Sequence, residues 1–170
     1  MTIIGILSDT HDNLIAIKRA VEVFKAHDVE MVFHAGDFVA PFALLPLFEF
    51  PCRLVLGNND GEIRLLRKRV KEHSDSVLEG VLLIEEINGK RIALTHGHHT
   101  QVFTTILTSG SFDVVISGHT HQQKDEVLSN QTLHINPGEG GGWISGRASV
   151  AILDLTSLER KFINTWQYNI

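Results

Sequence analysis

The sequence predicts an α/β fold whose first half alternates strands with helices and whose second half is rich in strands. Two observations carry this prediction. The apolar runs Ile3–Leu7, Met31–Gly36 and Arg53–Gly57 are separated by helix-like segments, the pattern of β-α-β units with parallel strands and right-handed crossovers. Farther along, Asn88-Gly89 separates two strand patterns and is a type I′ turn signal, so antiparallel hairpins are expected there.

The helices follow from hydrophobic periodicity and capping residues. Apolar residues recur at near-helical spacing over Leu14–His27, where Asp12 or Asn13 is placed to cap the N-terminus. The stretch Phe38–Phe50 predicts a helix of about two turns and then a turn. Another helix is expected over Asp60–Glu72, capped by its first residue. The remaining expected elements are a helix at His99–Thr108 and strands at Ser76–Leu78, Val81–Ile87, Lys90–Thr95, Phe112–Ser117, Gln122–Leu128, Thr132–Ile135, Ala148–Leu155 and Arg160–Tyr168.

Length and composition bound the organisation of the chain and its partners. With 170 residues and 43% hydrophobic composition, the chain can bury one ordinary core, so a single domain over residues 1–170 is expected. A net charge of −5 argues against a nucleic-acid binder held by phosphate neutralisation. No basic segment precedes the first apolar residues and no uncharged apolar run approaches the ~18 residues of a membrane span. A cytoplasmic protein without a membrane partner is therefore expected.

Three features leave alternatives open. The basic residues of the helix over Asp60–Glu72 form either a solvated face or a rim that attracts an anionic substrate, because this helix starts beside Asn58. The hydrophobic strands near the C-terminal end are compatible with a homo-oligomeric interface, which nothing in the sequence requires. The Gly-rich stretch Asn136–Trp143 lacks the Gly-Lys-Ser/Thr and the following helix of a P-loop, so a flexible turn is expected, with room for backbone contact to substrate.

Residues able to bind a metal follow the ends of five apolar runs. Asp9 and His11 stand two positions apart after the first run, so both side chains can point the same way and reach one cation. One such pair is weak evidence, because a turn with a capping Asp has the same pattern, but the signal recurs. Ligands bind at the carboxyl ends of strands in open α/β sheets, so these ends can share one pocket. The seven candidate metal ligands are Asp9, His11, Asp37, Asn58, His96, His119 and His121.

Seven ligands are too many for a single four-coordinate zinc site and suit two adjacent cations. Oxygen and imidazole donors without a thiolate favour manganese, iron, zinc, cobalt or nickel, and the residue types alone do not choose among these metals. Two such metals ~3.5–4 Å apart can activate a water molecule and stabilise an in-line displacement at phosphorus. The competing interpretation, ordinary polar residues at strand ends, would leave a cluster of uncoordinated histidines that repel one another when protonated.

The motifs in their order resemble those of the calcineurin-like metallophosphoesterases. The similarity runs from the first strand to Asn136, and the length of the chain is similar to the small single-domain branch of YfcE-type phosphodiesterases, whose relatives include the retromer subunit Vps29. The motifs that carry the resemblance are Asp9-x-His11, Gly36-Asp37, Gly57-Asn58-x-Asp60, His96-Gly97-His98 and Gly118-His119-x-His121.

The resemblance implies a four-layer α-β-β-α sandwich of two mixed sheets flanked by helices. It also implies a dinuclear metal centre, with manganese the first expectation, in which a metal-bridging hydroxide attacks a small phosphoester, a diester in preference to a monoester. The implied ligand sets are Asp9, His11, Asp37 and His121 for the first metal and Asp37, Asn58, His96 and His119 for the second, with Asp37 bridging.

One position departs from the pattern of the wider superfamily. Many of its members have a His after the motif Asn that can assist the leaving group, but here that residue is Asn59, whose amide can hydrogen-bond a phosphoryl group and is no useful proton donor. His98 is the nearest candidate for the leaving-group acid, and its alternative role is to orient a ligand. A second class of function stays open as well, a catalytically silent Vps29-like scaffold for protein partners.

Overall fold

The computed structural model describes residues 2–73 and 75–167. Its elements follow one another along the chain as β1 (Ile3–Leu7), α1 (Leu14–Ala26), β2 (Met31–His34), the 3₁₀ helix η1 (Pro41–Glu49), β3 (Cys52–Val55), α2 (Ile63–Lys71), β4 (Val77–Glu79), β5 (Leu82–Ile87), β6 (Lys90–Thr95), α3 (Thr100–Thr108), β7 (Val114–Ile116), β8 (Gln123–Val127), β9 (Leu133–Pro137), β10 (Arg147–Asp154) and β11 (Arg160–Gln167).

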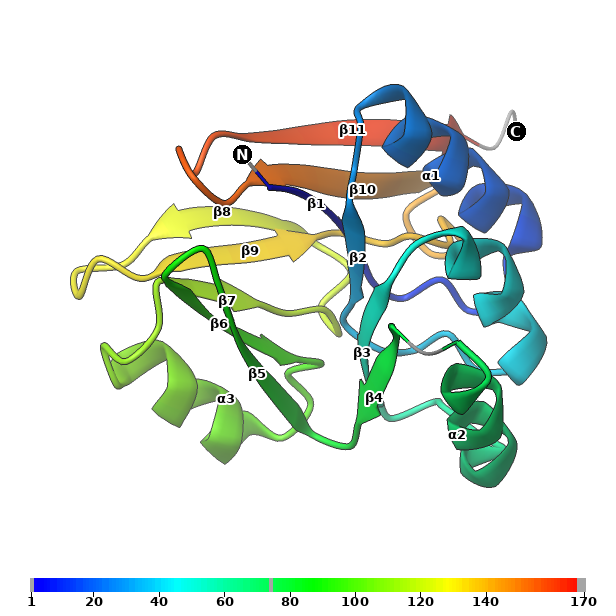
Figure 1. Ribbon diagram of the computed structural model, residues 1–170, viewed down its shortest axis with the longest axis horizontal. Coiled ribbons are helices and arrows are strands. Elements are labelled where there is room, and N and C mark those ends of the chain that lie inside the picture. The colour runs from blue at the N-terminus through cyan, green and yellow to red at the C-terminus, as the bar shows by residue number, and fades with distance from the viewer. Residues whose placement is uncertain (1, 74, 168–170) are drawn as a thin grey trace.

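The strands form two sheets (Figure 1). The six-stranded sheet has the order β11-β10-β1-β2-β3-β4, in which β1, β2, β3 and β4 are parallel and the last two strands of the chain pair antiparallel. The five-stranded sheet has the order β5-β6-β7-β9-β8, with a parallel centre and an antiparallel strand at each edge. Both sheets are therefore mixed, as the resemblance implied.

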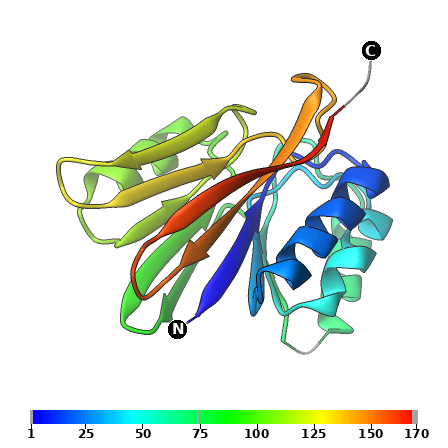
Figure 2. The same ribbon diagram turned by 90° about the horizontal axis from the view of Figure 1, so that it is seen from above.

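The two sheets stack face to face and helices cover their outer faces. Figure 2 shows α1, η1 and α2 outside the six-stranded sheet and α3 outside the other sheet, which gives the expected four layers. Side-chain alternation along β1 explains the arrangement: Ile4 and Ile6 belong to the core between the sheets, whereas Leu7 belongs to the core under α1 and η1. A third cluster, which includes Val115 and Ile106, lies under α3. The predicted α-β-β-α sandwich is confirmed.

The structure adds three details to the sequence-based predictions. The expected antiparallel hairpin joins β5 and β6, while β6, β7 and β9 pair in parallel through the crossovers that α3 and β8 provide. The strand predicted at Ser76–Leu78 is present as β4 and extends the first sheet in parallel beside β3. The segment after β2 forms a 3₁₀ helix, and Pro46 inside it disfavours an α-helix, because its ring would clash with the carbonyl oxygen of Phe42.

Other boundaries agree with the structure to within about two residues. Asn88 and Gly89 both have positive φ, at 52° and 72°, as a type I′ turn between β5 and β6 requires. Asn13 caps α1, because its side chain accepts a hydrogen bond from the N–H of Ala16. The predicted last strand extends to Tyr168, which lies outside the described residues. Over the described part of the chain, we find no helix with the length and apolar character to cross a membrane.

Candidate metal centre

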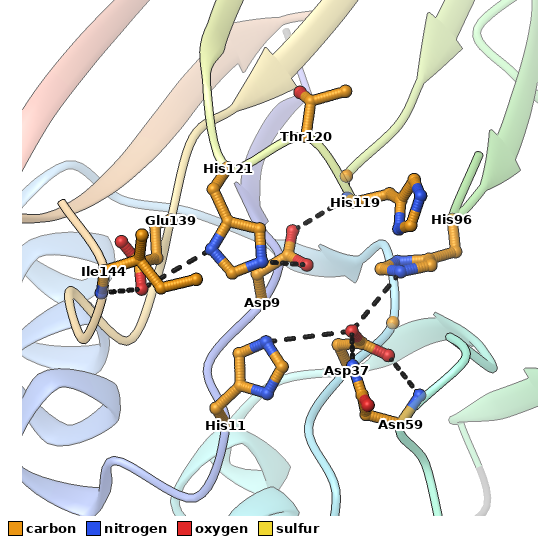
Figure 3. Close-up of polar contacts among 12 residues, drawn as sticks. Asp9, His11, Asp37, Asn59, His96, His119, Thr120, His121, Glu139 and Ile144 are labelled. Carbon is orange, nitrogen blue, oxygen red and sulfur yellow. Dashed lines mark hydrogen bonds and ion pairs between the residues drawn. The ribbon is translucent and has the colours of Figure 1, made fainter. Parts of the chain in front are cut away.

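The candidate ligands follow strands whose carboxyl ends meet where the two sheets come together. The chain turns sharply at the ends of these strands, and five of the seven candidates have the left-handed backbone conformation that such a turn uses. Their φ angles are 54° at Asp9, 42° at His11, 58° at Asp37, 69° at His119 and 58° at His121. Non-glycine residues seldom adopt this conformation, and such local strain is concentrated at functional sites. Here it turns side chains from separate strands toward one another (Figure 3).

Asp9, His11 and His121 form the first group of candidate ligand atoms, all within 4.8 Å of one another. The His121 Nε2 atom lies 3.4 Å from Asp9 Oδ1, and the two imidazole rings stack with centroids 5.4 Å apart. Within the described residues, Asp9 Oδ1 and His11 Nε2 are buried and have no hydrogen-bond partner. Buried polar atoms are rarely left without a hydrogen-bond partner, so these two unpaired atoms fit a site in which a cation would be their partner.

Asp9, Asp37 and His96 form the second group, again with ligand atoms within 4.8 Å of one another. His96 Nδ1 lies 2.7 Å from the Ala35 carbonyl oxygen, which can only accept, so Nδ1 carries a proton. In the neutral ring, Nε2 then presents a lone pair, 3.4 Å from Asp37 Oδ2 and 3.1 Å from Asn58 Oδ1. Three acceptors that face one another in this way need a proton or a cation between them.

Two carboxylates lie between the groups. Asp37 Oδ2 lies 3.7 Å from His11 Nε2 as well as 3.4 Å from His96 Nε2, which is the central position expected of a bridging ligand. Asp9 is a member of both groups, although the resemblance gave it to the first metal only. The last candidate, His119, is exposed, with its ring centroid 5.1 Å from that of His96, and its backbone N–H donates a hydrogen bond to Asp9 Oδ2 at 3.0 Å. The structure thus brings all seven candidates together.

Hydrogen bonding sets the ionisation of these carboxylates. Burial alone would raise the pKa of Asp37, but its contact with the protonated form of His96 and the hydrogen bonds from Asn59 outweigh burial and hold the pKa of this carboxyl well below its usual range. The pKa of His96 is raised, because its contact with Asp37 and the charge of Asp9 outweigh its burial. Burial dominates at Asp9 and raises its pKa. A divalent cation would supply the positive charge that favours the ionised form of Asp9.

Asn59 makes a contact that the sequence did not indicate. Its backbone N–H donates to Asp37 Oδ1 at 2.8 Å and its side-chain amide donates to Asp37 Oδ2 at 2.7 Å. Asn59 therefore fixes the orientation of the central carboxylate. The contact between this amide and a phosphoryl group stays a prediction.

His98 lies on the same side of the cluster as His96 and His119. Its ring centroid lies 5.3 Å from that of His96 and 6.3 Å from that of His119. Burial, and then the neighbouring His99 and His96, lower the pKa of His98. A neutral ring is suited to hydrogen-bonding a substrate oxygen, whereas a leaving-group acid must first take up a proton.

Asp60 was expected to cap α2, and that prediction is wrong. The N-cap position is Glu62, whereas the Asp60 carboxylate accepts hydrogen bonds from the backbone N–H groups of Gly57 at 2.6 Å, Val39 at 2.7 Å and Asp37 at 3.0 Å. It therefore ties the loop after β3 to the loop after β2. The available signal was its place two residues after Asn58 in the third motif, which a capping pattern matches equally well.

Glu139 is the functional candidate that sequence reasoning missed. It stands in the Gly-rich stretch that was expected to be a flexible turn, yet it is only 1% exposed. One carboxylate oxygen accepts from Ile144 N and the other from Ser145 N, both at 2.8 Å, and Oε1 lies 3.5 Å from His121 Nδ1. Burial would raise the pKa of Glu139, but these hydrogen bonds lower it, so the group is ionised at neutral pH.

The Gly-rich stretch packs closely against the first ligand loop. Gly140 N donates to Ser8 O at 2.7 Å and Gly141 N donates to Asp9 O at 2.9 Å. A Cβ on either glycine would lie 2.6 Å from a backbone oxygen, of Ser8 or of Thr10. The glycines are therefore required by a close approach of two backbones, and the expectation of a flexible turn is wrong.

Known proteins with similar sequences define the class of this chain. Residues 1–158 match the calcineurin-like phosphoesterase superfamily domain. The chain is 38% identical over 162 residues to phosphodiesterase MJ0936 of Methanocaldococcus jannaschii, across 94% of this chain and 97% of that protein. The chain belongs to the calcineurin-like phosphoesterase superfamily, which confirms both the resemblance and the expectation of a phosphoric ester hydrolase.

Solved structures agree with this assignment. One described as a novel archaeal phosphodiesterase superposes with a TM-score of 0.90 at 37% identity and covers 96% of this chain and 99% of its own. The YfcE phosphoesterase of E. coli has a TM-score of 0.66 at 20% identity, covering 97% and 100%. Vps29 of Chaetomium thermophilum has a TM-score of 0.70 at 14% identity, covering 91% and 83%. The last two likenesses concern the fold alone.

Proposed function

We propose that this protein is a phosphodiesterase that works with two divalent metal ions, manganese being the first expectation and zinc, iron, nickel or cobalt the alternatives. The observation that supports this most directly is the pair of adjacent ligand groups that share Asp9, with Asp37 between them and with orphaned donor atoms at Asp9 Oδ1 and His11 Nε2. The similarity to phosphodiesterase MJ0936 supports a diester substrate over a monoester.

The proposed ligand sets keep the assignment that the motifs implied. Asp9, His11, Asp37 and His121 would hold one metal, and Asp37, Asn58, His96 and His119 the other. When bound, the two cations would lower the pKa of a water molecule for in-line attack on phosphorus and neutralise the phosphoryl oxygens.

The chain's own residues have complementary tasks. Ala35 fixes the His96 tautomer by accepting from Nδ1, so that Nε2 is available as a ligand. Asn59 and Asp60 both position Asp37. Asn59 donates two hydrogen bonds to its carboxylate, and the Asp60 carboxylate accepts a hydrogen bond from its backbone N–H. The His98 ring lies beside those of His96 and His119 and, as a neutral ring, would hydrogen-bond a substrate oxygen.

A catalytically silent scaffold of the Vps29 type is the rival proposal. The fold alone does not separate the two functions, since similar folds serve unrelated tasks. All seven expected ligand positions carry residues able to bind a metal, and five of them form the two adjacent ligand groups, which supports the enzyme. A small phosphoester remains the proposed partner, while the cytoplasmic location, the single domain and a homo-oligomer stay predictions of the sequence.

The decisive assay compares metal-stripped protein with and without manganese on bis-p-nitrophenyl phosphate and p-nitrophenyl phosphate. We expect manganese-dependent hydrolysis that is faster on the diester and falls at least a hundredfold in Asp37→Asn, because that variant loses the central anionic ligand. His98→Ala is expected to retain both metals by elemental analysis and to lose turnover.

Each component of the proposal has its own contrary outcome. Far less than one metal per chain after incubation with manganese or zinc would contradict the metal centre. Metal binding without turnover of either ester would favour the scaffold. Unchanged rates in His98→Ala on both activated and alkyl leaving groups would remove His98 from the mechanism.

A further inference from the structure

Two large apolar side chains lie exposed beside the candidate metal centre. Trp143 is 56% exposed and Ile144 is 78% exposed, and both belong to the turn that follows the Gly-rich stretch. In Figure 3, Ile144 lies with Glu139 on one side of Asp9, whereas His96 and His119 lie on the other. We call this pair of side chains the apolar shelf.

Hydrogen bonds connect the apolar shelf to the ligand loops, directly from Trp143 and through Glu139 from Ile144. The Trp143 indole Nε1–H donates to the carbonyl oxygen of His11 at 3.0 Å. The N–H of Ile144 donates at 2.8 Å to the Glu139 carboxylate, which itself lies 3.5 Å from His121. The shelf is therefore joined to both histidines of the first ligand group.

The turn that carries the shelf is fixed in place. Glu139, which anchors it, is buried and accepts two backbone hydrogen bonds. Gly142 has a φ of 69°, and a Cβ there would lie 2.9 Å from the backbone nitrogen of Ala148. Asn13, the cap of α1, donates to the carbonyl oxygen of Gly141 at 2.6 Å. A shelf held this firmly can bind a ligand without a large ordering cost.

The two sides of the centre differ in chemistry. On the side of the second ligand group, the exposed residues are polar: Asn58, Asn59, His99, His119 and Thr120. On the side of the first group, the turn exposes the large apolar side chains of Trp143 and Ile144 together with Ser145 and Arg147. A phosphodiester has two ester substituents, and a centre with large apolar side chains on this flank can distinguish between them.

We propose that the apolar shelf is a substrate subsite that binds an aromatic ester substituent, such as a nucleobase or an aryl group, of the phosphodiester. An exposed indole offers a flat face for stacking, and contacts of this kind tolerate different ring systems. The hydrogen bond to the backbone carbonyl of His11 holds the indole edge against the first ligand loop. The proposal rests on the proposed phosphodiesterase function and names its substrate class.

The test measures equilibrium binding of two simple diesters to the manganese-loaded protein. Diphenyl phosphate has aromatic substituents and dimethyl phosphate has none. In a Trp166→Phe background, Trp143 is the sole tryptophan, because the chain has two, and its fluorescence reports stacking directly. We expect diphenyl phosphate to bind about tenfold tighter than dimethyl phosphate, a difference of about 1.4 kcal/mol, and to quench Trp143 emission.

Variants separate stacking from general damage. Calorimetric titration with the same diesters measures the preference for diphenyl phosphate over dimethyl phosphate in each variant. We expect this preference to fall below about threefold in Trp143→Ala and to be largely retained in Trp143→Phe, since a phenyl ring still stacks. Val127→Ala removes an equally exposed apolar side chain, 54% exposed at the far end of β8, and is expected to change nothing.

An unchanged preference in Trp143→Ala would overturn the proposal. The same holds if Trp143→Ala leaves the preference unchanged but converts an oligomer into a smaller species, since the shelf would then be covered by a second copy of the chain. The test does not depend on turnover. If bis-p-nitrophenyl phosphate is not hydrolysed while the aromatic preference and its loss are observed, the proposed phosphodiesterase function fails and the subsite stands.

Discussion

Single residues outside the motifs set the geometry of the candidate ligands. A histidine ligand is oriented by the hydrogen bond that its second nitrogen makes, and carboxylates often take this role. His96 Nδ1 has the Ala35 carbonyl oxygen as its hydrogen-bond partner, whereas His121 Nδ1 makes no hydrogen bond among the described residues and lies 3.5 Å from the buried carboxylate of Glu139. We therefore assign Glu139 as a positioning residue for His121.

We predict that Glu139→Gln weakens manganese binding by about 10–100-fold, because the neutral amide no longer holds the His121 ring. Isothermal titration of metal into stripped protein measures this effect directly. In a His121→Ala background the same substitution is expected to have little further effect, since residues that act through one another are not additive. A lower melting temperature with unchanged metal affinity would mean that Glu139 only anchors the 144–145 turn.

At the scale of elements, the 138–142 segment determines how closely two loops approach. The first ligand loop follows β1, and the Gly-rich segment follows β9 of the other sheet. Their backbones are joined by the hydrogen bonds from Gly140 N to Ser8 O and from Gly141 N to Asp9 O. This direct backbone contact links the sheets at the candidate centre.

We predict that Gly141→Ala destabilises the fold by about 1–3 kcal/mol, because the added methyl group would lie 2.6 Å from Thr10 O and only backbone could move to relieve it. Denaturant unfolding measures the loss, and metal titration is expected to detect weaker binding as the Asp9 loop shifts. Gly80→Ala is the matched control, since its methyl group would meet no atom within 4 Å. Equal stability of the two variants would contradict the close packing of the turn.

At the scale of the whole molecule, stability depends on histidines that the fold buries. His34 hydrogen-bonds the Thr10 hydroxyl at 3.0 Å, and His134 hydrogen-bonds the Ser117 hydroxyl at 2.9 Å. Burial lowers the pKa of His34 to about 3 and that of His134 to about 4. The unfolded chain takes up protons near pH 6.5 and the folded chain does not, so stability falls as the pH drops below about 6.5.

We predict that His134 alone contributes a fall of up to about 1.4 kcal/mol per pH unit between about pH 6 and pH 4.5. Below about pH 4 the contribution levels off, because the folded protein then binds the proton too. Urea unfolding of the metal-free protein across this range measures the slope of the free energy of unfolding against pH. His134→Gln is expected to reduce this slope by the contribution of one proton. If the free energy of unfolding depends on pH with the same slope in both proteins, His134 has the same pKa in the folded and unfolded states, which would contradict the prediction.

Much of this architecture follows from local sequence. Apolar runs, the Asn13 cap and the Asn88-Gly89 turn act over a few residues, so periodicity and turn chemistry predict them well. The seven candidate ligands could be named because each directly follows a strand pattern. Their order and spacing also predicted the calcineurin-like phosphoesterase family, which the similarity to known proteins confirms.

Tertiary structure decided the contacts between distant parts of the chain. Asn59 reaches back to Asp37, Asp60 ties two loops rather than capping α2, and Glu139 faces His121. Each residue type has a local role that fits the sequence equally well, such as a cap or a turn. The antiparallel pairing of β1 with β10 brings residues as far apart as Asn13 and Gly141 into contact, and no short-range pattern encodes a pairing between the two ends of the chain.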